Sequence, residues 1–329
     1  MTLIEANEYF SNKVNIKLAL LNKFYNKNIN MFYSIKMDTQ KILYNNKVKN
    51  IETYGNKNSK IKNIGHMQNL KELIVYNNLM NKNKNICQDT IKKLTNLIVL
   101  ACFLNQDFEN INHMRDLKIL YCRQANINQN GIRKISTIEK IDCSSNKNII
   151  NINHLQNLKK LFTKANSGLD QNGINKITRV TGLFCTENKK IKDINHMKKL
   201  KKLECRKTSI EQEGINKITR VIKLSCSNNE KINDLNHMKK LKRLYCRRKS
   251  GVDQEGISKL TGIVKFSCSN NNKIKDVNHM EKLKILFCIS NSGIDQNGIS
   301  RITNLVKLYC TNNEKIKNTD HMKNLKFFI

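Results

Sequence analysis

The stretch Cys226–Cys246 decides the fold, and it reads CSNNEKINDLNHMKKLKRLYC. Its apolar residues recur at every third position, at Ile232, Leu235, Met238, Leu241 and Leu244. The closing triplet Leu-Tyr-Cys alternates apolar, aromatic and apolar side chains. If this triplet is a strand, Leu244 and Cys246 face a core and Tyr245 faces outward.

The same pattern recurs along the chain, and a fixed period must be interpreted before any single motif. Seven histidines lie 47, 41, 42, 41, 42 and 42 residues apart, at His66, His113, His154, His196, His237, His279 and His321. Ten of the eleven cysteines lie 20 to 22 residues apart, except for one double gap that Thr163 fills. The unit is therefore a coil of about 21 residues, and two unlike coils alternate to give a 42-residue period.

The second kind of coil, residues 247–268, reads RRKSGVDQEGISKLTGIVKFSC. Both kinds fit Leu-x-x-Leu-x-x-Leu-x-(Leu/Cys)-x-x-Asn, which resembles the leucine-rich repeat. The first kind is similar to the short coils of internalin-like proteins, and the second to the cysteine-containing coils of F-box-associated repeats. The Lys- and Asn-rich pairing of coils, with Asn-His-Met recurring, resembles repeat proteins of amoeba-infecting giant DNA viruses. The resemblance covers roughly residues 47–329.

This resemblance implies an α/β solenoid, a horseshoe or arc with a parallel concave β-sheet and short helices or turns on the convex side. We expect about 13 coils over residues 39–329. Residues 1–38 do not repeat; Thr2 and Glu5 form a capping-box pattern followed by apolar residues at helical spacing, which predicts a helical N-terminal cap. The sequence ends at Ile329 inside an expected strand, with no evident C-terminal cap.

Polar residues in the coils predict local contacts. Asn229 and Asn271 follow a strand, where we expect them to satisfy backbone groups at the turn. Asp253 is a helix N-cap candidate, and Asp295 repeats it. A glycine recurs three positions later, as at Gly256, and implies either a close backbone contact or a positive φ.

Thiols and imidazoles are common metal ligands, and both recur along this chain. Their spacing, however, does not fit a metal site. Zinc sites use close ligand pairs such as Cys-x2–4-Cys, and the sequence has none. Histidines two coils apart would lie ~10 Å from each other, too far to share one ion. We expect buried, reduced cysteines, with occasional disulfides under oxidation left open, and histidines that hydrogen-bond at turns. Asp193, Asp234 and Asp276, three residues before a histidine, could raise its pKa.

Catalysis is not expected, because every candidate nucleophile or base is copied along the array, whereas an enzyme needs one unusual site. The sequence has no Gly-x-Gly-x-x-Gly, phosphate loop or His-Glu-x-x-His. We therefore expect no cofactor, metal or small-molecule substrate. No apolar run reaches the ~18 residues of a membrane span, and residues 1–25 lack a secretory-signal pattern. Many reduced thiols favour an intracellular, cytoplasmic location, in the host cytoplasm if the protein is viral.

The outward-facing strand positions are the candidate binding surface, because they combine aromatic and basic side chains. We expect the partner-binding residues to be Tyr121, Arg123, Phe162, Lys164, Phe184, Lys202, Arg206, Lys223, Arg243, Tyr245, Arg247, Lys265, Phe287, Lys307 and Tyr309. Aromatic rings among cations suit an acidic, partly apolar partner. The β-propensity of Tyr and Phe alone would also place them in exposed strand positions.

The net charge of +34, from 60 Lys and Arg against 26 Asp and Glu, also favours an acidic partner. Residues 186–250 hold 20 basic and 7 acidic side chains, a net charge of +13. We predict a non-enzymatic scaffold that binds an acidic protein or peptide. Nonspecific association with nucleic acid is the alternative, since such a surface would also stack bases and follow phosphates. A ubiquitin-ligase substrate adaptor is a third hypothesis, resting only on the resemblance to F-box-associated repeats.

Overall fold

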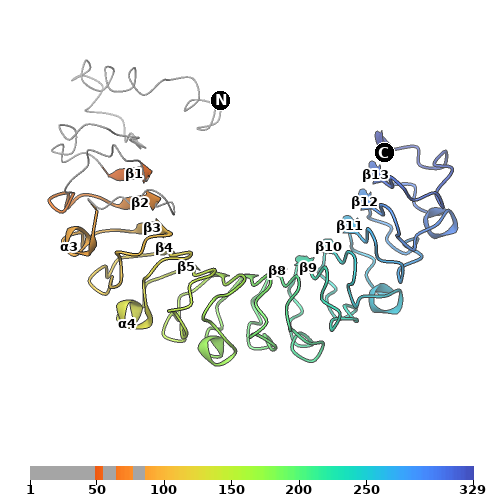
Figure 1. The fold of residues 1–329 in the computed structure, drawn as a ribbon. Coiled ribbons are helices and arrows are strands. Elements are labelled where there is room, and N and C mark those ends of the chain that lie inside the picture. Colours follow the sequence, from red (N-terminus) through yellow and green to blue (C-terminus); the bar gives the residue numbers. More distant parts are fainter. Residues whose placement is uncertain (1–48, 55–63, 77–85) are drawn as a thin grey trace, which may run out of the picture.

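The computed structural model describes residues 49–54, 64–76 and 86–329, and these form an arc-shaped solenoid (Figure 1). Fourteen parallel strands make one sheet whose order follows the chain from β1 to β14. The sheet lies along the inner, concave side of the arc, as the repeat pattern predicted (Figure 1). The predicted helical cap over residues 1–38 lies outside the described residues.

The strands are short, and most contain three residues. Their bounds are β1 Asn50–Tyr54, β2 Glu72–Tyr76, β3 Val99–Phe103, β4 Ile119–Tyr121, β5 Lys140–Asp142, β6 Lys160–Phe162, β7 Gly182–Phe184, β8 Lys202–Glu204, β9 Lys223–Ser225, β10 Arg243–Tyr245, β11 Lys265–Ser267, β12 Ile285–Phe287, β13 Lys307–Tyr309 and β14 Phe327–Phe328.

In the described residues, the outer side of the arc carries short helices in alternate coils, except that the coil around Gly214 forms turns without a helix (Figure 1). The helices are the α-helices α3 Gln88–Ile91 and α4 Gln129–Ile132, and the 3-10 helices η3 Asn172–Ile174, η4 Glu255–Ile257 and η5 Asn297–Ile299. Asp253 Oδ1 accepts a hydrogen bond from the Gly256 amide at 2.9 Å, and Asp295 makes the same bond to Gly298. The aspartates thus bond to the helical turn as predicted, but the N-cap positions lie one residue later, at Gln254 and Gln296.

The core is one continuous apolar layer between the sheet and the outer turns. Leu244 pairs in register with Leu224 on one side and Phe266 on the other, and none of the three is exposed. The ladder cysteines continue this layer, since Cys226, Cys246 and their equivalents are buried. A coil buries its apolar residues only against its neighbours, which is the defining property of a solenoid.

A left-handed backbone position follows most strands, two residues after each ladder position. Eleven residues have φ between 52° and 64°, at Leu104, Gln124, Ser145, Ala165, Glu187, Lys207, Asn228, Arg248, Asn270, Ser290 and Asn312. None of them is glycine, although a left-handed conformation costs most other residues about 1–2 kcal/mol. The stacked coils therefore hold the chain in a turn that its local sequence disfavours.

The recurring glycine is explained by a close approach of two coils and not by its φ, since no described glycine has a positive φ. A Cβ atom at Gly256 would overlap the carbonyl oxygen of Asn233 in the preceding coil. The same clash would arise at the equivalent glycines of four other coils, Gly131, Gly173, Gly214 and Gly298. Of the two expected reasons, the positive φ is wrong and the close backbone contact is confirmed.

The histidines are turn residues that tie one coil to the previous one. His196 Nε2 lies 3.0 Å from the carbonyl oxygen of Ile174, and five other histidines make the equivalent contact at 2.8 to 3.1 Å. Burial lowers the pKa of His196 and His237, although the hydrogen bonds and the nearby Asp193 and Asp234 oppose the shift. The expected rise in these two pKa values is therefore wrong, because desolvation outweighs the carboxylates.

The cysteine ladder is structural. Its ten thiols are free, and burial raises the pKa of Cys143 to about 12. Thr163 takes the missing position, where it is buried and its Oγ1 accepts a hydrogen bond from Asn188 Nδ2 at 3.1 Å. Among the described residues, no group of three or more His, Cys, Asp or Glu side chains could hold a metal ion.

Candidate binding surface on the concave face

Three columns of side chains face outward from the sheet, and strand register defines them. The leading column takes the first residue of each strand, as in Lys223, Arg243 and Lys265. The central column takes the third, as in Tyr245, and the trailing column takes the residue two positions later, as in Arg247. Successive strands lie ~4.8 Å apart, so each column is a closely spaced row of side chains.

All fifteen predicted site residues fall in these three columns, and none is buried. The central column contains Tyr121, Phe162, Phe184, Tyr245, Phe287 and Tyr309; the leading column contains Lys202, Lys223, Arg243, Lys265 and Lys307; the trailing column contains Arg123, Lys164, Arg206 and Arg247. The structure therefore brings them onto one surface. Whether that surface binds a partner stays a prediction.

The aromatic residues of the central column stack where they occupy adjacent strands. Phe162 and Phe184 have ring centroids 4.2 Å apart with planes 5° apart, and Phe287 and Tyr309 are 4.2 Å and 2° apart. Tyr245 has no aromatic neighbour in its column, because Ser225 and Ser267 flank it. The column is thus interrupted on both sides of one ring.

Sequence reasoning missed a second aromatic row near β2 and β3. Tyr76 stacks on Phe103 with centroids 5.1 Å apart, and Phe103 lies 5.9 Å from Tyr121. These residues end the longer strands β2 and β3, where the ladder motif is less regular. The aromatic character of both residues at the equivalent strand position was the available signal.

Cations lie over the aromatic faces along the sheet. Lys140 Nζ is 4.7 Å from the Tyr121 ring centroid and 2.6 Å from its hydroxyl oxygen. Lys223 and Lys265 both lie within 5.9 Å of the Tyr245 ring. Such contacts stabilise by roughly 0.5–1 kcal/mol at exposed sites, and they leave the cation charged and accessible to an anion.

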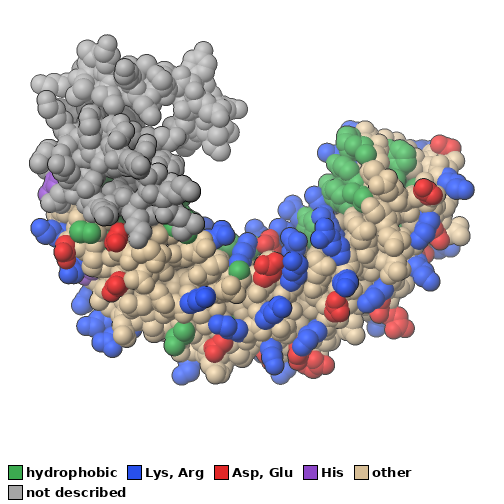
Figure 2. Space-filling model, viewed as in Figure 1, with side chains coloured by type: hydrophobic (Ala, Val, Ile, Leu, Met, Phe, Trp, Pro, Cys, Tyr) green, Lys and Arg blue, Asp and Glu red, His purple; other side chains and the backbone are tan. Residues whose placement is uncertain are grey.

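Carboxylates balance some of these cations but not the arginines near Tyr245. Glu204 in the central column pairs with Lys223 at 3.3 Å, and Asp142 occupies the equivalent position on β5. Arg206, Arg247 and Arg248 have no carboxylate partner among the described residues. Figure 2 shows basic side chains gathered on the inner side of the C-terminal arm of the arc.

A pocket of about 530 Å³ opens on this part of the concave face, which we call the Tyr245 pocket. It is lined by Arg206, Ser225, Ser227, Asn228, Tyr245, Arg247, Arg248, Ser269, Asn270, Phe287 and Ile289. Ser267 forms no part of the exposed surface, although its central-column position faces outward. Arg247 covers it, since its Nε donates a hydrogen bond to Ser267 Oγ and its guanidinium lies 5.6 Å from Tyr245 and 5.7 Å from Phe287.

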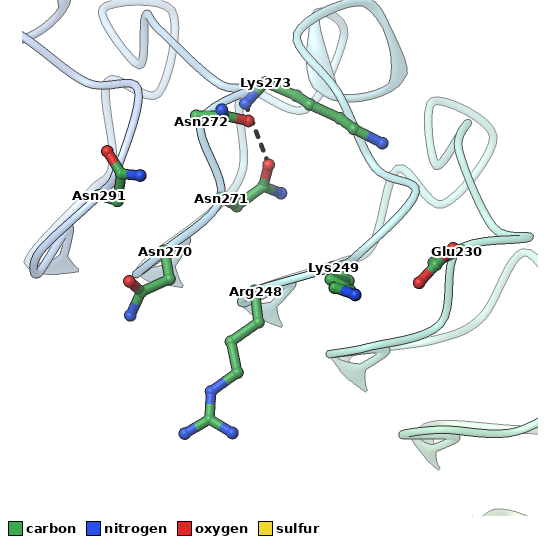
Figure 3. A pocket seen from close by; sticks show the side chains of 8 residues that line it. All are labelled: Glu230, Arg248, Lys249, Asn270, Asn271, Asn272, Lys273 and Asn291. Atoms are coloured by element: carbon green, nitrogen blue, oxygen red, sulfur yellow. Dashed lines mark hydrogen bonds between the residues drawn. The ribbon is translucent and has the colours of Figure 1, made fainter.

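The environment of Arg247 also acts on the pKa of its guanidinium. Burial is the main cause that lowers the pKa of Arg247, and the charges of Arg206 and Arg248 lower it further. A second cavity of about 770 Å³ lies beside the Tyr245 pocket, on the turns that follow the strands (Figure 3). It shares Arg248 and Asn270 with the first cavity, and the Arg248 side chain extends away from the backbone (Figure 3).

The parallel sheet, the coil period and the concave surface define a leucine-rich-repeat solenoid. Solved structures with this fold include an internalin from Listeria monocytogenes, 20% identical, with a TM-score of 0.65 over 88% of each chain. The functional domain of InlJ from Listeria monocytogenes, which includes a cysteine ladder, is 19% identical with a TM-score of 0.58, covering 85% of this chain and 66% of that one. A leucine-rich-repeat protein of Leptospira interrogans is 16% identical with a TM-score of 0.56, over 90% of this chain and 93% of that one.

These likenesses show the fold alone. No family model and no curated protein sequence matches the chain. None of the helices in the described residues is long and apolar enough to cross a membrane.

Proposed function

We propose that the protein is a non-enzymatic binding scaffold whose concave face holds an acidic protein or peptide. The observation that carries this proposal is the register of the three columns, which places cations against aromatic faces on several strands of the sheet. Aromatic residues and arginines are the side chains that contribute most to protein interfaces. The excess of positive charge favours a partner whose surface is negatively charged.

A triple variant tests this proposal. Replacing Tyr245, Phe287 and Tyr309 by Ala removes the aromatic row of the C-terminal arm while the buried face of each strand stays intact. Partner capture in a pull-down should be lost, and the far-UV circular dichroism spectrum should stay unchanged. The control is Ile150→Ala, which removes an exposed apolar side chain outside the columns. Undiminished capture by the triple variant contradicts the proposal.

Nucleic-acid association is the second candidate, and the ring stacks with nearby cations are the observation that favours it. It requires that the logarithm of the affinity for a single-stranded oligonucleotide falls linearly with the logarithm of the salt concentration. Undetectable binding at physiological salt rules it out as a working function.

We further propose an intracellular location, because a ladder of free thiols suits a reducing compartment. If the resemblance to giant-virus repeat proteins holds, the acidic partner belongs to the amoebal host. An adaptor role in ubiquitin ligation keeps only its original support, the likeness of the second coil type to F-box-associated repeats.

A further inference from the structure

We infer that the Tyr245 pocket binds a phosphotyrosine side chain, and we place that side chain on the acidic protein partner, so the inference rests on the proposed function. The pocket combines three elements that such a side chain requires: clustered guanidinium groups, hydroxyl and amide hydrogen-bonding groups, and aromatic walls. Each of them comes from different strands or turns that the coil register brings together.

The charge of the pocket points to a dianion. Three arginines line it, and no Asp or Glu is among the lining residues. Elsewhere along the described coils, cations such as Lys207, Lys223 and Lys231 have a glutamate partner within 3.3 Å. A phosphate monoester carries about −1.5 to −2 charges at neutral pH and three acceptor oxygens, and arginine forks match its geometry. A single carboxylate supplies one charge and two oxygens, which leaves more of this cationic cluster uncompensated.

Arg247 lies over Ser267 in the free protein and has donors that no other described residue uses. Its Nε is engaged by Ser267 Oγ, while its two terminal nitrogens have no hydrogen-bond partner among the described residues. Its main-chain amide also donates to Ser227 Oγ at 3.2 Å, which fixes the start of the turn. The hydrogen bond to Ser267 holds the guanidinium between Tyr245 and Phe287 in the free protein, so a ring that inserts there must turn it outward.

The walls of the pocket favour an aromatic phosphate. Stacked rings on adjacent strands lie 4.2 Å apart. Tyr245 and Phe287 are two strands apart, so the space between their rings, above Ser267, has about the width of one further ring in contact with both. The Arg247 guanidinium occupies that space in the free protein, 5.6 Å from the Tyr245 ring and 5.7 Å from the Phe287 ring. A phenyl ring that displaced it would lie between two aromatic faces, and the guanidinium released from Ser267 would be free to bind the phosphate. A phosphoserine would reach the cations but leave both faces uncovered.

Fluorescence anisotropy with labelled peptides tests the inference at physiological salt. The probes are a short acidic peptide with one central tyrosine, the same peptide phosphorylated on that tyrosine, and a phosphoserine version. We expect the phosphotyrosine peptide to bind at least about tenfold more tightly than the unphosphorylated one and more tightly than the phosphoserine one. Equal binding of phosphorylated and unphosphorylated peptides, or no binding of either, overturns the inference.

Two variants and a control separate this pocket from general charge attraction. Arg247→Gln should remove most of the advantage of the phosphotyrosine peptide. Ser267→Phe should do the same without any change in charge, because a ring at that position fills the gap as Phe184 does beside Phe162. Arg220→Gln removes an exposed arginine outside the pocket and should leave all affinities unchanged. An equal loss from Arg220→Gln, or none from Arg247→Gln and Ser267→Phe, also overturns it.

The outcome is distinguishable from failure of the proposed function. The unphosphorylated acidic peptide could bind tightly, depend on Tyr245 and gain nothing on phosphorylation. That result contradicts the phosphotyrosine site and still supports a scaffold that binds an acidic partner. A single-stranded oligonucleotide that binds as tightly as the phosphotyrosine peptide, and loses as much on Arg247→Gln, overturns the inference in favour of nucleic acid.

Discussion

The left-handed positions after the strands are the residues at which the chain departs most from its local preferences. Ala165 is one of them, with a φ of 53° and a methyl side chain. Its neighbour Asn166 is exposed, is not among the positive-φ residues and makes no side-chain hydrogen bond with the described residues. Replacing each of the two residues by glycine therefore distinguishes the relief of backbone strain at Ala165 from the general effect of introducing a glycine.

We predict that Ala165→Gly stabilises the protein by up to about 1 kcal/mol, because glycine adopts this φ without the steric cost that alanine bears. Chemical denaturation measures the change as a higher midpoint. Asn166→Gly should give no gain or a small loss, since it only adds freedom to the unfolded chain. A lower midpoint for Ala165→Gly contradicts the assigned strain.

Histidine burial makes stability depend on pH. Burial lowers the pKa of four of the repeated imidazoles below the unfolded value of 6.5, at His113, His154, His196 and His237. As the pH falls through about 6.5, the unfolded chain takes up protons that the folded chain does not, so stability decreases. The loss is complete below the folded pKa values, where both states are protonated.

The denaturation midpoint should therefore be lower at about pH 5 than at about pH 7.5. His196→Gln preserves a hydrogen-bond donor toward the Ile174 carbonyl and removes one titrating group. This variant should show a weaker pH dependence than the parent protein. A midpoint that rises on acidification contradicts the lowered pKa values.

Single residues also show where sequence reasoning succeeds and stops. The inward direction of Leu244 and Cys246 follows from the period of a strand alone. The burial of Ser267 does not, because it depends on where the Arg247 side chain lies, and a long side chain has many accessible rotamers. The three outward-facing columns were thus predictable from the sequence, whereas the Tyr245 pocket was not.

At the scale of the coil, side-chain amides connect each unit to its neighbours. Gln254 Nε2 donates to the Asp276 carbonyl, and its Oε1 accepts from the amides of Lys275 and Asp276 in the next coil. Five other glutamines make the same bridge, at Gln88, Gln129, Gln171, Gln212 and Gln296. The sequence showed this glutamine as part of a helix start. Its partners lie about 22 residues away and became evident only from the stacking of coils.

Buried asparagines serve the same purpose at the turn after the strand, as expected for Asn229 and Asn271. Asn271 Nδ2 donates to the Cys246 and Val252 carbonyls at 3.0 Å, and its Oδ1 accepts from the Lys273 amide at 3.1 Å (Figure 3). Both atoms of one side chain therefore satisfy backbone groups of two successive coils.

We predict that Asn271→Ala destabilises the protein by roughly 2–3 kcal/mol, because it leaves buried backbone groups without partners. Thermal or urea unfolding measures the loss. The matched control is Asn272→Ala at the next position, an exposed residue whose side chain makes no hydrogen bond with the described residues. Equal effects of the two substitutions would show that the buried bridge contributes nothing beyond an exposed asparagine.

At the scale of the whole molecule, the net charge of +34 opposes folding through self-repulsion. Salt screens exposed charges, with a Debye length of about 10 Å at 0.1 M. We therefore predict that Tm rises by a few degrees between about 20 mM and about 300 mM sodium chloride. A Tm that is constant or falls would indicate that the cations are already balanced within the fold. A labelled acidic peptide that binds the concave face should raise Tm most at the low-salt end.

Because the order of strands in the sheet is the order of strands in the chain, the molecule can lengthen or shorten without rerouting its backbone. Gene duplication or loss of one 42-residue pair of coils would add or remove ~10 Å of groove and six outward-facing positions. Such events change the concave surface by whole pairs of coils, while the Leu, Cys, Asn and Gly positions that build each coil stay the same. The Tyr245 pocket spans only a few such modules, so one recombination event suffices to transplant it whole or to erase it.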